Sequence, residues 1–311
     1  MKKSLLMIML LIFTLFTVGC GEDEYITTTT TREIFNLLKD DAGRDVPLEK
    51  KPERIVVTSA SFLEPLHAVG GTVVGRPDSK TQMPDWAKDI TSIGQVYNVD
   101  VEKTISCNPD LVIINKGMNE KLLDVLEKNQ IPALVLDMKS YDSVKNELMI
   151  FGELTENTKK SKEIIDEMDN EIKKIIDKMP KDNHKVAILH STAQGLTVQL
   201  DGSIAGNIIK MFGWENVASG MTPLENNPDA APYSLETLAE QNPEIIFVTS
   251  MGEIEDIKKN MQKNIDSNPA WKSIGAIKNN QLYYLPQDLF LLSPGLRYTE
   301  AVKTIADLVK K

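Results

Sequence analysis

The sequence predicts an α/β protein of two lobes separated by one long helix. Three observations predict it: short apolar runs alternate with helix-length mixed segments, one long amphipathic stretch interrupts this alternation, and the alternation then restarts. The 311 residues suffice for two domains, since a domain usually takes roughly 150 residues.

The N-terminal lobe is assigned to residues 41–155. Strands are predicted at residues 54–58, 72–75, 111–114 and 133–136. Each is short, rich in β-branched residues and bounded by Gly, Pro, Asn or Asp, as buried strands are. Helix-length segments at residues 120–129 and 143–152 follow the later strands, which indicates βα units and a mostly parallel sheet.

Residues 156–180 are predicted to form the connecting helix. Isoleucine and methionine recur between Ile164 and Met179 at steps of one, three and four residues, while Lys, Glu, Asp and Asn fill the remaining positions. This pattern makes one apolar stripe on a helix. At ~1.5 Å per residue the helix is roughly 36 Å long, about the size of a lobe, and Pro180 is expected to end it.

The C-terminal lobe is assigned to residues 181–311. Its strands are predicted at residues 185–189, 196–200, 244–248 and 281–285, with a last helix at 299–310. The two lobes also share an echo, because Asn108-Pro-Asp and Asn242-Pro-Glu each follow a short helix and lead into a buried strand. We therefore predict two lobes of similar topology.

The N-terminus has the pattern of a targeting segment. Lys2 and Lys3 precede an apolar run that stops at Gly19-Cys20, which predicts a signal peptide over residues 1–19. The run is shorter than the about 20 residues of a membrane-spanning helix. Thr17-Val-Gly-Cys20 resembles the bacterial lipobox, with Thr17 where that motif usually has Leu, so Cys20 is predicted to be acylated. Residues 20–40 are interpreted as the lipidated cysteine and a flexible tether.

Composition and motifs exclude several classes of function. The formal charge of −10, from 35 Lys and Arg against 45 Asp and Glu, disfavours nucleic acid as a partner. Two cysteines without a C-x-x-C pair indicate neither a disulfide scaffold nor structural zinc. No G-x-S-x-G, H-E-x-x-H or G-x-G-x-x-G motif occurs, and the three histidines are scattered. We expect a binding protein without an intrinsic cofactor, not an enzyme.

Two facing lobes are expected to form one ligand cleft, because open α/β sheets bind ligands beyond the carboxyl ends of their strands. The segments expected there are residues 58–64, 76–86, 94–98, 115–119, 190–194, 249–253 and 286–295. They carry Ser, Thr, Met, Trp, Tyr, His and a few basic residues. This mixture suits a large, partly apolar ligand with some polar or metal contacts.

Motifs that run in order over residues 40–311 resemble one family. They are D-x-x-G-R at 40–44, K-P-E-R-I-V-V from 51, S-x-x-x-x-E ending at 64, V-G-R-P at 74–77, I-G at 93–94 followed by V-D-V-E-K, N-P-D-L-V-I at 108–113, W-E-N-V at 214–217 and S-P-G-L-R at 293–297. The family is that of substrate-binding lipoproteins of bacterial ABC importers for iron-siderophores, heme and cobalamin. The resemblance implies two Rossmann-like lobes of the class III periplasmic-binding-protein fold, a connecting helix that limits hinge opening, and no catalysis.

The resemblance is greatest to heme receptors of Gram-positive bacteria, and it implies heme or a ferric siderophore as the ligand. In those receptors the loops that match residues 93–98 and 249–252 supply a Met and a His to the iron. Tyr97 and Met251 stand there in this chain, and both residue types can ligate heme iron. The candidate ligand-binding residues are Tyr97, Met251, His190, Arg76, Lys116 and Tyr233.

Other ligands remain open. Cobalamin is the alternative within the same class of importer. An anionic siderophore would favour a cluster of cations, for which Arg76, Lys80 and Lys116 are the candidates. A free metal ion is less favoured, because a zinc or manganese receptor would need about three histidines and a carboxylate that converge.

The resemblance also implies a partner, an ABC permease dimer with its ATPase subunits. Glu64 and Glu215 stand where the family places glutamates that meet permease arginines, one in each lobe. Ser61-x-x-Glu64 also fits a helix capping box. The protein is expected to be a monomer, held by its lipid at the outer face of the cell membrane.

Overall fold

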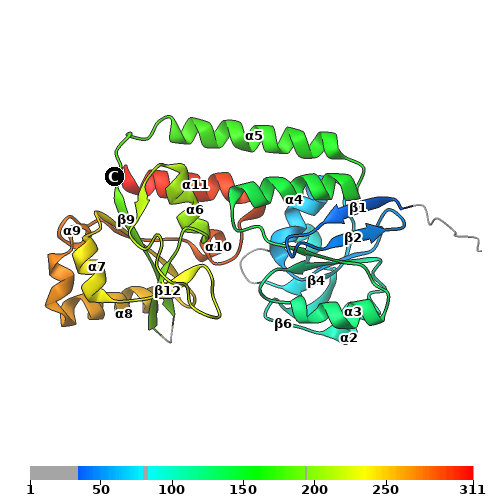
Figure 1. Cartoon of the computed structure of the whole chain (residues 1–311), viewed down its shortest axis with the longest axis horizontal. Helices are drawn as coiled ribbons and strands as arrows, with labels where there is room; N and C mark the ends of the chain where they lie inside the picture. The colour runs from blue at the N-terminus through cyan, green and yellow to red at the C-terminus, as the bar shows by residue number, and fades with distance from the viewer. Residues whose placement is uncertain (1–33, 80–82, 193–194, 311) are drawn as a thin grey trace, which may run out of the picture. The chain divides into compact units, whose positions relative to one another are not determined.

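The N-terminal lobe is built on a six-stranded sheet of short, mostly buried strands. The computed structural model describes residues 34–79, 83–192 and 195–310 (Figure 1). The strands are β3 (Ile55–Val57), β4 (Val73–Asp78), β5 (Thr91–Gln95), β6 (Asn98–Val99), β7 (Leu111–Asn115) and β8 (Ala133–Leu136), in the order β6-β5-β4-β3-β7-β8. All neighbours are parallel except β5 and β6. The parallel strands therefore have the Rossmann order 3-2-1-4-5, whose switch point lies between β3 and β7.

Helices connect these strands, and a side chain caps the first residues of η1, α2 and α4. They are η1 (Ala60–Phe62), α1 (Leu63–Ala68), η2 (Asp85–Ala87), α2 (Val101–Ser106), η3 (Glu120–Leu122), α3 (Leu123–Lys128) and α4 (Tyr141–Leu154). The Asp100 carboxylate accepts from the Lys103 amide at the start of α2, and Ser140 forms a capping box with Ser143 at the start of α4. The predicted helix at 120–129 is thus a 3₁₀ turn followed by a short α-helix.

The C-terminal lobe has its own six-stranded sheet, of mixed direction. The strands are β9 (Lys185–Thr192), β10 (Gly195–Gln199), β11 (Glu215–Asn216), β12 (Ala230–Pro232), β13 (Ile245–Ser250) and β14 (Leu282–Tyr284). The order is β12-β10-β9-β13-β14, and β11 also pairs with β9. The four strands predicted here are confirmed, but β10 runs antiparallel to β9 and β12, which the apolar pattern did not reveal.

Helices flank this second sheet. They are α6 (Ile204–Met211), α7 (Leu235–Gln241), α8 (Ile254–Ser267), η4 (Pro269–Ser273), α9 (Gly275–Lys278), α10 (Gln287–Phe290), η5 (Gly295–Arg297) and α11 (Tyr298–Val309). The Asn-Pro motif that the two lobes share in the sequence also has the same structure in both. Asn108 and Asn242 both adopt a left-handed conformation, φ 47°, between a short helix and a proline that leads into β7 or β13.

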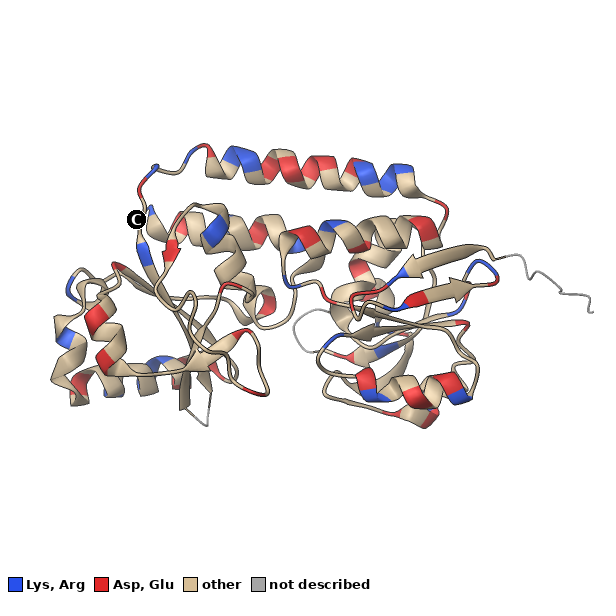
Figure 2. Cartoon of the chain, in the orientation of Figure 1, with Lys and Arg blue, Asp and Glu red and all other residues tan. Residues whose placement is uncertain are grey.

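The connecting helix is α5 (Thr158–Ile176), which runs along α4 and α11 (Figure 1). It is shorter than the predicted 156–180, because Glu156 has φ 58° and closes the turn after α4. Ser161 fixes α5 to α4 through a hydrogen bond of 2.6 Å from its hydroxyl to the Leu148 carbonyl oxygen. Met168 and Ile172 are buried, while Lys, Asp and Glu lie along the rest of the helix (Figure 2).

A hairpin precedes the first sheet and corrects one prediction. Strands β1 (Asn36–Lys39) and β2 (Asp45–Leu48) pair antiparallel, with Leu38, Val46 and Leu48 in the core. The predicted tether is therefore wrong for residues 36–40. The predicted signal peptide and Cys20 lie outside the described residues. None of the described helices is long and apolar enough to cross a membrane.

Candidate functional site

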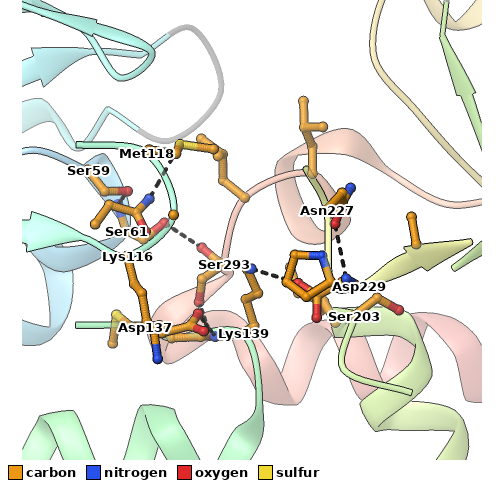
Figure 3. Close-up of a pocket in the computed structure, with 18 of the residues that line it drawn as sticks. Ser59, Ser61, Lys116, Met118, Asp137, Lys139, Ser203, Asn227, Asp229 and Ser293 are labelled. Carbon is orange, nitrogen blue, oxygen red and sulfur yellow. Dashed lines mark hydrogen bonds and ion pairs between the residues drawn. The ribbon is translucent and has the colours of Figure 1, made fainter. Parts of the chain in front are cut away.

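A cavity of about 540 Å³ lies at the carboxyl ends of strands from both sheets (Figure 3). The N-terminal lobe lines it with Ser59, Ser61, Phe62, residues 115–118, Glu120 and residues 137–139. The C-terminal part of the chain lines it with His190, Gln199, Ser203, Ile204, residues 226–230 and residues 290–293. Its size falls within the roughly 300–1,000 Å³ of small-molecule sites.

The two loops at the switch point are held together by backbone groups. The Thr58 amide donates to the Ile113 carbonyl oxygen, and the Thr58 hydroxyl accepts a hydrogen bond of 2.8 Å from the Asn115 amide. These bonds fix the chain as it leaves β3 and β7. They therefore place Ser59 and Lys116 at the same wall of the cavity.

An ion pair crosses the cavity between the two lobes. Lys139 Nζ lies 2.6 Å from Asp229 Oδ2 (Figure 3). Burial alone would lower the pKa of Lys139, but the hydrogen bond to Asp229 and the nearby carboxylate charges together raise it. Ser293 adds two further links, since its carbonyl oxygen accepts from the Ser61 hydroxyl and its own hydroxyl donates to the Met138 carbonyl oxygen.

Three carboxyl groups lie behind the same wall. Asp137 lines the cavity, and its amide donates a hydrogen bond of 2.8 Å to Asp41 Oδ2. Glu147 of α4 is fully buried beside them. Burial first, and the charge of Asp41 second, raise the pKa of Glu147 well above its ordinary value. Lys116 faces this group and donates from Nζ to the Asp41 carbonyl oxygen, 2.6 Å away.

The buried Glu147 carboxyl should make stability fall as pH rises. The folded chain keeps Glu147 protonated above the ordinary pKa of 4.5, whereas the unfolded chain ionises it, so the folded state binds more protons. Glu147→Gln is expected to flatten the pH dependence of the unfolding free energy between about pH 5 and 8, by at most about 1.4 kcal/mol per pH unit. Urea unfolding at several pH values measures this slope. The exposed Glu153→Gln in the same helix is the control, and equal slopes for wild type and Glu147→Gln would contradict the prediction.

His190 reaches the cavity from the end of β9. Its side chain is half-buried, and its Nδ1 lies 3.0 Å from the Thr249 hydroxyl oxygen on the neighbouring strand β13. Burial lowers the pKa of His190, so the imidazole is neutral at physiological pH. The cavity thus combines a neutral imidazole, two lysines and an apolar surface that includes Met118, Leu291 and Leu292.

A model of the family described as periplasmic binding protein matches residues 55–289, which covers both sheets. The chain belongs to the periplasmic binding protein family. Family members of this type are extracytoplasmic substrate-binding proteins of ABC importers rather than enzymes. A curated relative, the high-affinity heme uptake system protein IsdE of Staphylococcus aureus, is 26% identical over 260 residues, or 83% of this chain and 87% of the relative.

Solved structures of this family agree with the fold. Staphylococcus aureus IsdE complexed with heme has a TM-score of 0.71 at 26% identity, over 83% of this chain and 99% of that chain. An ABC transporter substrate-binding protein from Listeria monocytogenes has a TM-score of 0.74 at 24% identity, over 83% and 98%. Staphylococcus aureus SirA complexed with staphyloferrin B has 0.70 at 20%, over 88% and 98%. The predicted fold, two Rossmann-like lobes joined by one long helix, is confirmed as that of class III periplasmic binding proteins.

In this chain, neither Tyr97 nor Met251 lines the cavity. Tyr97 is 69% exposed in the turn between β5 and β6, and Met251 is 57% exposed after β13. Both loops nevertheless adjoin the site. The carbonyl oxygen of Val96 accepts from the Asn119 side chain, and the Met251 amide donates to the Ser191 carbonyl oxygen.

Arg76 and Tyr233 also lie away from the cavity lining, each for a packing reason. The buried Arg76 guanidinium donates to the Ala87 and Lys88 carbonyl oxygens and pairs with Asp78 at 2.7 Å, so it is committed to its own lobe. Tyr233 stacks on Trp271 with ring centroids 6.3 Å apart, and burial raises its pKa. Of the predicted ligand-binding residues, the structure brings Lys116 and His190 to the cavity. Lys80 lies outside the described residues.

The predicted cleft lacked two segments of the cavity lining, and it also lacked Glu120, Gln199, Ser203 and Ile204. Residues 137–139 follow β8, so the rule used for the other strand ends would have included them. Residues 226–230 form a loop before β12, a strand that was not predicted, and their sequence signals only a turn.

Glu64 and Glu215, one on each lobe, are both exposed. Glu64 is in the first turn of α1, and Glu215 is in β11. Neither carboxylate forms an ion pair with another residue in the described part of the chain. The predicted capping box is wrong, because α1 begins after Phe62 without a side-chain cap and the Ser61 hydroxyl donates to Ser293 instead.

Proposed function

We propose that this protein captures an iron complex, heme, in the cavity between its two lobes and delivers it to an ABC importer. The observation that carries the proposal is the composition of the cavity. It offers thioether and aliphatic surface from Met118, Leu291 and Leu292 beside the neutral His190 imidazole. A porphyrin needs such an apolar surface, and its iron accepts nitrogen or sulfur ligands.

The lysines of the cavity can bind the propionate groups of heme. Its two propionate groups are carboxylates, and the Lys139 ammonium already holds the Asp229 carboxylate at 2.6 Å. A propionate can take the place of Asp229, because a charge-assisted hydrogen bond forms equally well with either carboxylate. Lys116 is the second cation at the same wall. The name of the curated relative, a heme uptake protein, supports this ligand.

A ferric siderophore is the second candidate, and the same two lysines favour it. Against it stands the lack of arginine among the described residues that line the cavity. Arg44, Arg54 and Arg297 are bound to groups of their own lobes, as Arg76 is. A highly anionic catecholate siderophore would lose its hydration on binding, and the cavity has few cations to compensate for that loss. Cobalamin is the remaining alternative of the same importer class.

Titration of the purified protein with heme, a panel of ferric siderophores and cobalamin tests the proposal. Heme is expected to saturate at one equivalent with a shifted Soret band. Lys139→Met is expected to weaken heme binding about 10- to 150-fold, since a hydrogen bond to a charged group contributes about 1.5–3 kcal/mol. Heme dimethyl ester, which lacks the propionate charges, is the matched control and should bind both proteins alike. Preference for a siderophore over heme would contradict the proposal.

Delivery and location complete the proposal. Glu64 and Glu215 dock the two lobes onto arginines of a permease dimer that works with its ATPase subunits. Their exposure and their lack of ion-pair partners among the described residues support this role. Acylated Cys20 holds the protein at the outer face of the cell membrane, since two acyl chains anchor stably where one does not. We expect the bound complex to be released unchanged.

A further inference from the structure

His190 occupies a distinctive position on its sheet. Alternate residues of a strand share one face, so His190 follows Val186 and Ile188 on the face that packs into the main core. Thr249 follows Ile245 and Phe247 on the same face of the adjacent parallel strand. At the position of His190, this face of the sheet no longer packs against the core and lines the cavity instead. The imidazole is therefore the last side chain of a rigid row of core residues.

Hydrogen bonds around Thr249 decide which ring nitrogen of His190 carries the proton. The Thr249 hydroxyl lies 3.3 Å from the Leu189 carbonyl oxygen, which can only accept, so the hydroxyl proton is directed there. Thr249 Oγ1 must then accept at its second contact, the 3.0 Å approach of His190 Nδ1. Nδ1 is consequently the protonated nitrogen. The lone pair lies on Nε2, for which the described residues provide no hydrogen-bond partner.

We infer that His190 Nε2 coordinates the iron of the bound heme. The inference rests on the proposed function and assigns the group that holds the metal. A ligating histidine usually donates its other ring N–H to an oxygen acceptor, which orients the ring and increases the basicity of the ligating nitrogen. Thr249 supplies that acceptor from a side chain that is 1% exposed. The protein thus holds His190 in the orientation and tautomer of an iron ligand before heme arrives.

His190 suits this role better than the exposed Met251 at the neighbouring strand end. Met251 is absent from the cavity lining, and its side chain makes no hydrogen bond within the described residues. A flexible exposed thioether would have to be ordered on binding, which costs side-chain entropy. His190 is already ordered by β9 and Thr249. The C-terminal lobe therefore provides an imidazole to the iron, although it comes from β9 and not from the loop after β13.

Absorption and electron paramagnetic resonance spectra of the heme-loaded full chain test the assignment. His190→Ala is expected to lose the spectrum of an imidazole-ligated iron and to bind heme at least tenfold more weakly. Added imidazole should restore the spectrum, because it can enter the space left by the side chain. His184→Ala is the matched control, since His184 pairs with Glu244 at the other end of β9 and lies outside the cavity lining.

Variants of Thr249 separate ligation from packing. Thr249→Val removes the acceptor while keeping the shape, and it should shift the spectrum and weaken binding less than His190→Ala does. Thr249→Ser should behave as wild type. A wild-type spectrum in His190→Ala overturns the assignment. So does a His190→Ala spectrum that imidazole does not restore, if Met251→Leu abolishes the wild-type spectrum. Either result leaves the heme proposal standing. A wild-type protein that binds no heme overturns both.

Discussion

Cells whose only copy of this protein is the Glu64→Ala, Glu215→Ala double variant are expected to lose uptake of the iron complex, while the purified variant binds it normally. Neither glutamate lines the cavity, so the binding affinity should stay at the wild-type value. Both are exposed, one on each lobe, where a permease dimer can meet them together. Charge pairs at the rim of an interface govern orientation and association rate more than intrinsic stability.

Uptake of iron-labelled heme by intact cells, beside titration of the purified variant, measures the two halves of this prediction. Glu102→Ala combined with Glu236→Ala is the matched control. These two glutamates are also exposed, and they lie in the first turns of α2 and α7, the corresponding helices of the two lobes. Each single docking variant should transport at an intermediate rate. Normal uptake by the double variant would contradict the docking proposal.

Asp40→Ala is expected to destabilise the fold by about 1–3 kcal/mol or more, the cost of leaving buried hydrogen-bond donors without an acceptor. The Asp40 side chain is fully buried and accepts from Arg44 Nη2 at 2.6 Å and from Arg44 Nε at 2.9 Å. It also accepts from the amides of Ala42, Arg44 and Val135. Removing the carboxylate leaves these donors without an acceptor and loosens the β1–β2 hairpin from β8.

Unfolding by urea, followed by circular dichroism, gives the change in free energy. Asp45→Ala in the same hairpin is the control, because Asp45 is exposed and its removal should change stability by less than about 0.5 kcal/mol. Arg44→Ala should cost less than Asp40→Ala, since the three amides keep their acceptor. Equal stability of Asp40→Ala and Asp45→Ala would show that the hairpin does not depend on this carboxylate.

The sequence determined the elements whose patterns are long or repeated. Residues 111–114 and 186–189 are continuous apolar runs, and both lie in strands of the structure, because strands buried on both faces are made of such runs. The Asn-Pro echo at 108 and 242 likewise predicted two equivalent helix-to-strand junctions. Strands β5, β6, β11 and β12 and the β1–β2 hairpin were not predicted, because none of them contains a continuous run of β-branched apolar residues.

Tertiary structure alone decided which polar side chains meet. Arg76 and Lys116 both come shortly after a predicted strand. In the structure Arg76 lies within β4 and binds Ala87, Lys88 and Asp78 of its own lobe, whereas Lys116 follows β7 and reaches the cavity. Lys139 and Asp229 are 90 residues apart and pair only because two sheets face one another. The protonated nitrogen of His190 depends on Thr249, which is 59 residues away. The apolar pattern of a strand is local in the sequence and indicates only that the strand is buried. A binding site depends on which strand ends lie next to each other, and the whole fold determines that.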